Sequence, residues 1–179
     1  MAQYGNFTFE ETGLADCVII KPKVFEDARG YFCETFRANL FEEAGLPAFV
    51  QHNQSFSQQG VLRGLHRQRQ FPQGKLVRAM VGRIYDVAVD MRDGSATYGK
   101  WMGVELSDEN KWSLYVRPGF AHGFLVLSEK ALFVYQCTDY YHADDEIGFR
   151  YDDPSIGVQW PLDGITLMLS DKDAALPFL

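Results

Sequence analysis

The chain has 179 residues, of which 46% are hydrophobic, 15% aromatic and 23% charged, so its composition predicts one folded domain and excludes an intrinsically disordered chain. No apolar run approaches the roughly 20 residues of a membrane-spanning helix, and the first residues lack the basic and apolar blocks of a signal peptide. A formal net charge of −7 excludes a general attraction to nucleic acid or to an anionic membrane.

The sequence predicts many short strands with turn residues between them. Apolar runs and alternating patterns mark the expected strands in chain order: 18–25, 60–68, 76–81, 84–92, 101–106, 113–116, 123–127, 131–138 and 147–151. Only residues 39–44 and 171–175 have a helical pattern. Strands and helices do not alternate regularly, so a parallel sheet is not expected, and the pattern favours an antiparallel jelly roll or a related barrel.

The three cysteines, Cys17, Cys33 and Cys137, include no CxxC pair. Their spacing predicts neither a disulfide framework nor a zinc ribbon. Reduced thiols and the lack of a signal peptide fit a cytoplasmic protein.

Polar residues on strand faces that should be apolar are the first candidates for a site. His66 shares a face with Leu62 and Gln68, and regular alternation places Arg63 on the opposite face, unless Gly64 bends the strand. Lys75 shares a face with the apolar Val77 and Ala79. It is therefore expected at the rim of a cavity or inside it, although a strand-end lysine reaching solvent is the simpler interpretation.

Two further residues stand out on expected strands. His122 follows a Pro-Gly turn, and Tyr135 alternates with Phe133 and Cys137. His66 and His122 suggest a metal site, but two isolated imidazoles without a nearby carboxylate fall short of a three-ligand centre. The local sequence is equally compatible with a histidine bonded to the backbone and a tyrosine in the core. In the segment 169–173, Ser170 fits the N-cap of a helix.

A series of short sequence phrases occurs in order along residues 18–179: KPKVFEDARGYFCETF, FVQHNQS, GVLRGLH, QGKLVR, PGFAHGFLVLSE, TDYY and LSDKDAALP. In these phrases the chain resembles the dTDP-4-dehydrorhamnose 3,5-epimerases, which are cupin-fold sugar-nucleotide epimerases. The resemblance implies an all-β, cupin-type antiparallel jelly roll with a few short helices, in a single domain over residues 1–179. Departures include Arg67, where the family often has an aromatic residue, and a slightly short 69–73 loop.

The resemblance also implies the roles of individual residues. His66 with Asp173 matches the general base, Tyr135 the general acid, and Lys75 the cation beside the C4 ketone. Other positions match residues that contact the substrate together with Lys75: Arg29, Phe32, Glu34, Gln51, Asn53, Arg63, His122, Glu146 and Lys172. No metal or cofactor is implied. The family forms homodimers, so residues 18–25 are expected to pair with a second copy and to bring Arg29 and Phe32 close to its pocket.

The expected reaction is inversion at C3 and C5 of dTDP-4-dehydro-6-deoxy-D-glucose. Both protons lie alpha to the C4 ketone, so a histidine base and a cation at O4 suit their removal. Alternatives are a single-centre epimerase or a 3,4-ketoisomerase on the same nucleotide sugar, and from other classes a non-catalytic sugar-nucleotide-binding cupin or a metal-dependent cupin oxygenase.

Overall fold

Two antiparallel sheets and a projecting hairpin make up most of the computed structural model, which describes residues 1–14 and 16–179. The larger sheet has the order β1-β2-β3-β11-β8-β13-β6, with β1 Ala2–Tyr4, β2 Phe7–Glu11, β3 Cys17–Pro22, β11 Ser113–Val116, β8 Lys75–Val81, β13 Lys130–Cys137 and β6 Gln51–Gln58. The smaller sheet has the order β10-β9-β12-β7-β14, with β10 Trp101–Ser107, β9 Arg83–Asp90, β12 Phe120–Val126, β7 Leu62–Gln68 and β14 Glu146–Gly148.

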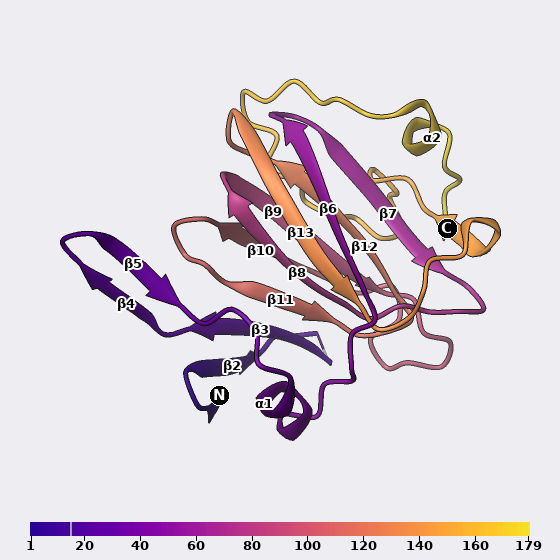
Figure 1. Cartoon of the computed structure of the whole chain (residues 1–179). Coiled ribbons are helices and arrows are strands. Elements are labelled where there is room, and N and C mark those ends of the chain that lie inside the picture. Colours follow the sequence, from indigo (N-terminus) through magenta and orange to yellow (C-terminus); the bar gives the residue numbers. More distant parts are fainter. Residues whose placement is uncertain (15) are drawn as a thin grey trace.

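The main core lies between the inner faces of the two sheets. It includes Val77, Leu114 and Phe133 from the larger sheet and Ala88 and Phe124 from the smaller one, all nearly or fully buried. Both sheets are antiparallel, so one face of each can be apolar while the ends stay open. The expected jelly-roll arrangement of antiparallel strands is therefore present (Figure 1).

Short helices and coil cover the outer faces of the sheets. Helix α1 (Ala38–Glu43) places Phe41 against Phe7 and Phe9, with edge-on ring contacts at 5.1 and 5.4 Å. On the smaller sheet, Ile156 and Trp160 pack over Val87 and Val89 of β9. The 3-10 helix Ala143–Asp145 and helix α2 (Asp171–Ala174) complete the helices. In the described residues no helix is long and apolar enough to cross a membrane.

Strand β9 is buried on both faces, although its sequence alternates between apolar side chains and the carboxylates of Asp86 and Asp90. Val87 and Val89 are covered by the C-terminal coil, and Asp86 and Asp90 on the other face are also fully buried. Asp90 is satisfied by Arg92, Ser95 and Thr97 in the following loop. Alternation alone therefore indicated the two faces of β9 correctly but not their burial, because a central strand can be covered on both sides.

The expected strand 18–25 is divided into two elements. Its first part cannot pair with a second copy as expected, because β3 lies between β2 and β11 in its own sheet. Pro22 ends β3, and the chain continues in β4 (Val24–Asp27), which pairs with β5 (Gly30–Cys33). In Figure 1 this hairpin projects away from the two sheets. Its side chains Tyr31 and Phe32 are 56% and 69% exposed, so the hairpin carries aromatic surface that the described chain does not cover.

Two glycines bring β7 and β12 unusually close together. Gly64 has a φ of +110°, and a Cβ added to it would lie 2.6 Å from the His122 carbonyl oxygen and 2.7 Å from the Gly123 Cα. A Cβ on Gly123 would lie 2.6 Å from the Arg63 carbonyl oxygen. Only glycine accommodates both the positive φ and this backbone contact.

Candidate functional site

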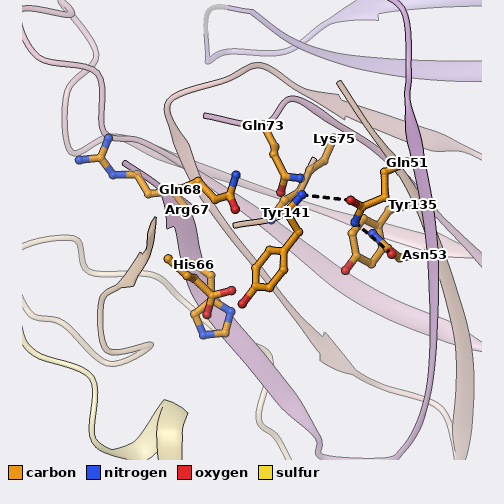
Figure 2. A pocket seen from close by; sticks show the side chains of 10 residues that line it. Gln51, Asn53, His66, Arg67, Gln68, Gln73, Lys75, Tyr135 and Tyr141 are labelled. Carbon is orange, nitrogen blue, oxygen red and sulfur yellow. Dashed lines mark hydrogen bonds between the residues drawn. The ribbon is translucent and has the colours of Figure 1, made fainter. Parts of the chain in front are cut away.

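A cavity with two connected lobes opens between the sheets and contains most of the predicted site residues. The lobes have volumes of about 340 and 300 Å³ and share His66, Lys75, Tyr135 and Glu146. Gln51 and Asn53 line the first lobe, and the second lobe is lined by the remaining predicted residues that reach the cavity: Arg63, His122, Lys172 and Asp173. Figure 2 shows the first lobe, with Gln51 donating to Asn53 at 3.2 Å.

His66 and Asp173 meet at the junction of β7 and α2. The Nε2 atom of His66 lies 2.6 Å from Oδ1 of Asp173, and their side chains are 22% and 7% exposed. The geometry of this contact falls short of a regular hydrogen bond, and neither atom has another hydrogen-bond partner in residues 1–14 and 16–179. Burial alone would raise the pKa of Asp173, but the contacts from His66 and Ser170 lower it, so the carboxylate stays charged beside the imidazole.

A bulge in β7 explains why Arg63 and His66 line the same lobe. His66 is opposite His122 and Arg63 is opposite Phe124, so three steps on β7 match two steps on β12. The extra residue falls at Gly64 and Leu65, and it turns Arg63 to the cavity side. The prediction from regular alternation, which placed Arg63 on the opposite face, is therefore wrong, and the bend at Gly64 that the sequence left open is present.

Lys75 and Tyr135 enter the cavity from the larger sheet. Lys75 is opposite Cys137 on the neighbouring strand β13, and Tyr135 lies two residues before Cys137 on the same face. Burial lowers the pKa of Lys75, although Cys137, Glu146 and Asp86 oppose this effect. Burial also raises the pKa of Tyr135. The two side chains thus bring to the cavity an ammonium group with a lowered pKa and a hydroxyl that keeps its proton at neutral pH.

Glu146 on β14 joins the two lobes and forms an ion pair with Lys172 of α2. Burial alone would raise the pKa of Glu146, but Lys172 and the His66 side chain lower it. The pair connects α2 to the smaller sheet beside the His66 imidazole.

His122 forms a second histidine–aspartate pair. Its Nε2 atom lies 2.9 and 3.0 Å from the two carboxylate oxygens of Asp86, and the pair is 7% and 0% exposed. A histidine bonded only to backbone, which the sequence also allowed, is therefore not what the structure contains. Asp86 was not predicted, because it lies on a neighbouring strand and 36 residues away in sequence.

Three predicted contact residues lie outside both lobes. Arg29 and Phe32 belong to the projecting hairpin, where Arg29 pairs with Asp27 at 2.5 Å. Glu34 follows the hairpin and accepts a hydrogen bond from Arg37 at 2.6 Å. Within one chain the structure does not bring these residues to the cavity.

Several cavity residues were not predicted as site residues. Gln68 and Gln73 fix the rim: Gln68 donates to the Phe71 carbonyl at 2.6 Å and Gln73 to the Asp139 carbonyl at 2.7 Å. Tyr141 lies in the first lobe, its backbone N–H donating to Gln51 at 3.0 Å, and points into the pocket in Figure 2, where Arg67 extends away from the centre. Ser55 lines the second lobe with a buried hydroxyl. The TDYY phrase was the available signal for Tyr141.

The site has no metal-binding arrangement in the part of the chain that the structure describes, since no group of three or more His, Cys, Asp or Glu side chains there could hold an ion. Both cavity histidines instead face a single carboxylate each. The donor set therefore suits proton transfer between side chains and a bound organic molecule.

Comparison with known proteins identifies close relatives. Residues 11–179 match the model of a family described as dTDP-4-dehydrorhamnose 3,5-epimerase. The chain is 53% identical over 170 residues to the dTDP-4-dehydrorhamnose 3,5-epimerase of Methanothermobacter thermautotrophicus, covering 94% of this chain and 92% of the relative.

Solved structures give the same result. The crystal structure of a dTDP-6-deoxy-D-glucose-3,5-epimerase from Legionella pneumophila, in complex with dTDP-4-keto-L-rhamnose, has a TM-score of 0.92 and 48% identity and covers 96% of this chain and 92% of that one. A dTDP-4-dehydrorhamnose 3,5-epimerase from Bacillus anthracis, with TDP and PPi bound, has a TM-score of 0.92 and 39% identity, with 97% and 99% coverage.

Proposed function

Because the chain belongs to the dTDP-4-dehydrorhamnose 3,5-epimerase family, we propose that His66 with Asp173, Tyr135 and Lys75 carry out this epimerisation in the two-lobed cavity. The family, the isomerase class and the cupin-type fold expected from the sequence are confirmed. The observation that carries the residue assignment is that His66 and Tyr135 face one cavity from opposite sheets, with Lys75 lining both lobes.

The ligand is a dTDP-linked 4-keto-6-deoxyhexose, as in the Legionella relative that holds dTDP-4-keto-L-rhamnose. Its sugar ring lies where the lobes join. Its diphosphate lies in the second lobe, because the cationic side chains Arg63 and Lys172 line that lobe and guanidinium and ammonium groups bind phosphate oxygens.

His66 removes the protons. Asp173 occupies Nε2, which leaves Nδ1 to face the substrate. The carboxylate fixes the ring orientation and stabilises the imidazolium that forms when Nδ1 takes a proton from C3 or C5. Each removal yields an enolate with its charge on O4, and the Lys75 ammonium stabilises that charge more strongly than it stabilises the neutral ketone.

Tyr135 returns a proton on the opposite side of the ring. It comes from β13 of the larger sheet, whereas His66 comes from β7 of the smaller one, so a ring between the sheets has one group on each side. Inversion requires removal on one side and addition on the other. The raised pKa of Tyr135 keeps its hydroxyl protonated and ready to donate to the enolate carbon.

The test is turnover of dTDP-4-keto-6-deoxy-D-glucose in deuterium oxide, followed by NMR at C3 and C5. Wild type should invert both carbons and place solvent deuterium at each. Tyr135→Phe keeps the ring but lacks the donor, so deuterium exchange should persist while the L-sugar hardly forms. Normal inversion by Tyr135→Phe would contradict the assignment of the acid, and loss of all exchange in the folded variant would contradict the two-sided division of roles.

We further propose a homodimer in which the β4–β5 hairpin of one subunit completes the cavity of the other. The hairpin projects from its own chain (Figure 1) and its Phe32 is 69% exposed. Arg29 and Phe32 lie outside the cavity of their own chain, so they can contact substrate only in a neighbour. An exposed aromatic hairpin is also a surface that association would cover.

Mixing two inactive variants tests this arrangement. His66→Ala lacks the base, and Phe32→Ala lacks the hairpin contact. If the hairpin acts in the partner, a refolded 1:1 mixture should regain about a quarter of wild-type activity, because half of the dimers are mixed and each of these has one intact site. Light scattering of the wild type should give twice the 20.4 kDa chain mass. An active monomer, or a mixture without recovery, would contradict the proposal.

A further inference from the structure

The two oxygens of the Asp173 carboxylate have different partners, and the second partner has no role in the mechanism above. Oδ1 faces His66 Nε2 at 2.6 Å. Oδ2 accepts a hydrogen bond from the Ser170 hydroxyl at 2.8 Å. We propose that Ser170 is a positioning residue of this enzyme, which holds the Asp173 carboxylate in the orientation that the His66 base requires; this inference rests on the assignment of His66 and Asp173 proposed above.

The Ser170 hydroxyl makes two bonds at once. It donates to Asp173 Oδ2, and it accepts from the Asp173 backbone N–H at 3.1 Å as the N-cap of α2. A hydroxyl has one proton and two lone pairs, so it can fill both roles. Both bonds go to the same residue, and together they fix the backbone of Asp173 and the rotation of its carboxylate.

Helix α2 needs such a constraint because it has only four residues. A helix this short has little stability of its own, and it must still hold Asp173 against a histidine on a different element, β7. Other bonds reach α2 at its ends: Lys172 pairs with Glu146, and Arg150 donates to the Ala174 carbonyl at 3.3 Å. Neither of them touches the Asp173 carboxylate, whereas the Ser170 hydroxyl and the Gly64 backbone do.

The bond also affects the charge of the carboxylate. Ser170 helps to lower the pKa of the Asp173 carboxyl, so loss of the bond moves the protonation of this carboxylate to higher pH. The other charged or titratable groups that line the cavity with His66 are Glu146 from β14, Lys172 from α2, Lys75 from β8, Tyr135 from β13, His122 from β12, Tyr141 from the rim, and Arg63 and Arg67 from β7 itself. None of these changes when Ser170 is replaced, so a shift of the acidic limb of kcat/KM reports on the Ser170 bond.

The experiment separates positioning from helix capping. Glycine is nearly as good an N-cap as serine, whereas alanine is poor, and neither can donate to the carboxylate. Ser170→Gly and Ser170→Ala should therefore both lower kcat by roughly 10-fold, the scale of a lost hydrogen bond to a charged group, with KM little changed. In both variants the acidic limb of kcat/KM should move to higher pH. Ser170→Thr keeps the hydroxyl and should restore the wild-type values.

Asp171→Ala is the matched control, because Asp171 is an exposed residue in the first turn of α2 and does not contact Asp173. It should retain wild-type kcat and pH dependence. The inference is overturned if Ser170→Gly behaves like wild type, if only Ser170→Ala is impaired, or if Asp171→Ala is impaired equally. Asp173→Asn measured in parallel identifies a different failure: if that variant stays fully active, the proposed base itself is wrong.

Discussion

The cavity contains two histidine–aspartate pairs that lie opposite each other across β7 and β12, since His66 and His122 are register partners. In the pair His122–Asp86 both residues belong to central strands and both carboxylate oxygens face the imidazole. In the pair His66–Asp173 the carboxylate comes from a four-residue helix and presents one oxygen. The same two types of side chain thus form a buried, strand-held pair and a more exposed pair that opens to the cavity.

This difference indicates a division of tasks. His122–Asp86 is nearly inaccessible, so this hydrogen-bonded pair chiefly maintains the inner wall of the cavity. His66 is 22% exposed and opens to both lobes, so its free nitrogen can exchange a proton with a ligand. Variants of the two pairs should therefore differ in whether activity or stability is lost.

The largest expected effect is on catalysis by the pair that faces the cavity. His66→Ala and Asp173→Asn should each lower kcat by about 10²–10⁴-fold, the usual contribution of general-base catalysis. Substrate affinity should change little, because the phosphate contacts remain. Steady-state kinetics and titration calorimetry with dTDP measure the two quantities. Near-normal kcat in His66→Ala would show that the His66–Asp173 pair does not act as the general base.

The next effect concerns stability. Asp86→Asn leaves a buried imidazole without its anionic partner, and the free energy of unfolding should fall by about 3 kcal/mol. Asp173→Asn should cost less, because its surroundings are more open. Urea denaturation of both variants at pH 7 gives the comparison directly. Equal losses in the two variants would show that the strand-held pair has no special structural role.

A smaller effect is expected on the pH dependence. Burial lowers the pKa of Lys75, so as pH rises its ammonium loses a proton before the ordinary lysine pKa of about 10.4 is reached. The decline of kcat/KM on the basic side should lie in the same pH range. Lys75→Arg keeps its charge throughout this range. Whatever activity this variant retains should persist to higher pH than in wild type. An unchanged basic limb would assign the titration to another group.

The smallest effect is on acid stability. The pKa of Asp173 is lower in the folded chain than its ordinary value, because His66 and Ser170 outweigh the opposing effect of burial. The folded state therefore binds this proton less tightly than the unfolded state, so the stabilisation is complete above the ordinary aspartate pKa of about 3.9 and is lost as pH falls through the lowered value. Asp173→Asn should show a shallower loss of stability below pH 4. A slope identical to wild type would contradict this.

Apolar patterns predicted most of the fold. The strands after residue 60 and both helices were expected close to their observed bounds, and 113–116 matches β11. Strand β6 was missed, because its inward side chains Gln51, Asn53 and Ser55 line the cavity instead of the core, which leaves no apolar alternation to detect. A strand that serves a polar site is thus hidden from a search for hydrophobic faces.

Strand patterns singled out His66, Lys75 and Tyr135, and all three line the cavity, but the roles of these residues and the partner Asp173 were predictable only through family resemblance. No local pattern connects His66 to Asp173, because the pair depends on α2 reaching β7 across more than a hundred residues of chain. For Arg29 and Phe32 the family resemblance predicted a role but not their position in the structure. Their sequence matches substrate contacts, but no strand pattern indicates that they project away from their own cavity. Pairing with another chain is not encoded in the periodicity of one.

The contact between Gly64 and Gly123 limits how this enzyme can diversify. Any side chain at either position would push β7 away from β12 and separate the two histidines, so the floor of the cavity tolerates almost no substitution there. Variation in substrate preference is then expected at the rim, where Gln73 donates to the Asp139 carbonyl and the Tyr141 backbone N–H donates to Gln51 of β6. For laboratory evolution this means that libraries should randomise the rim and leave both glycines fixed.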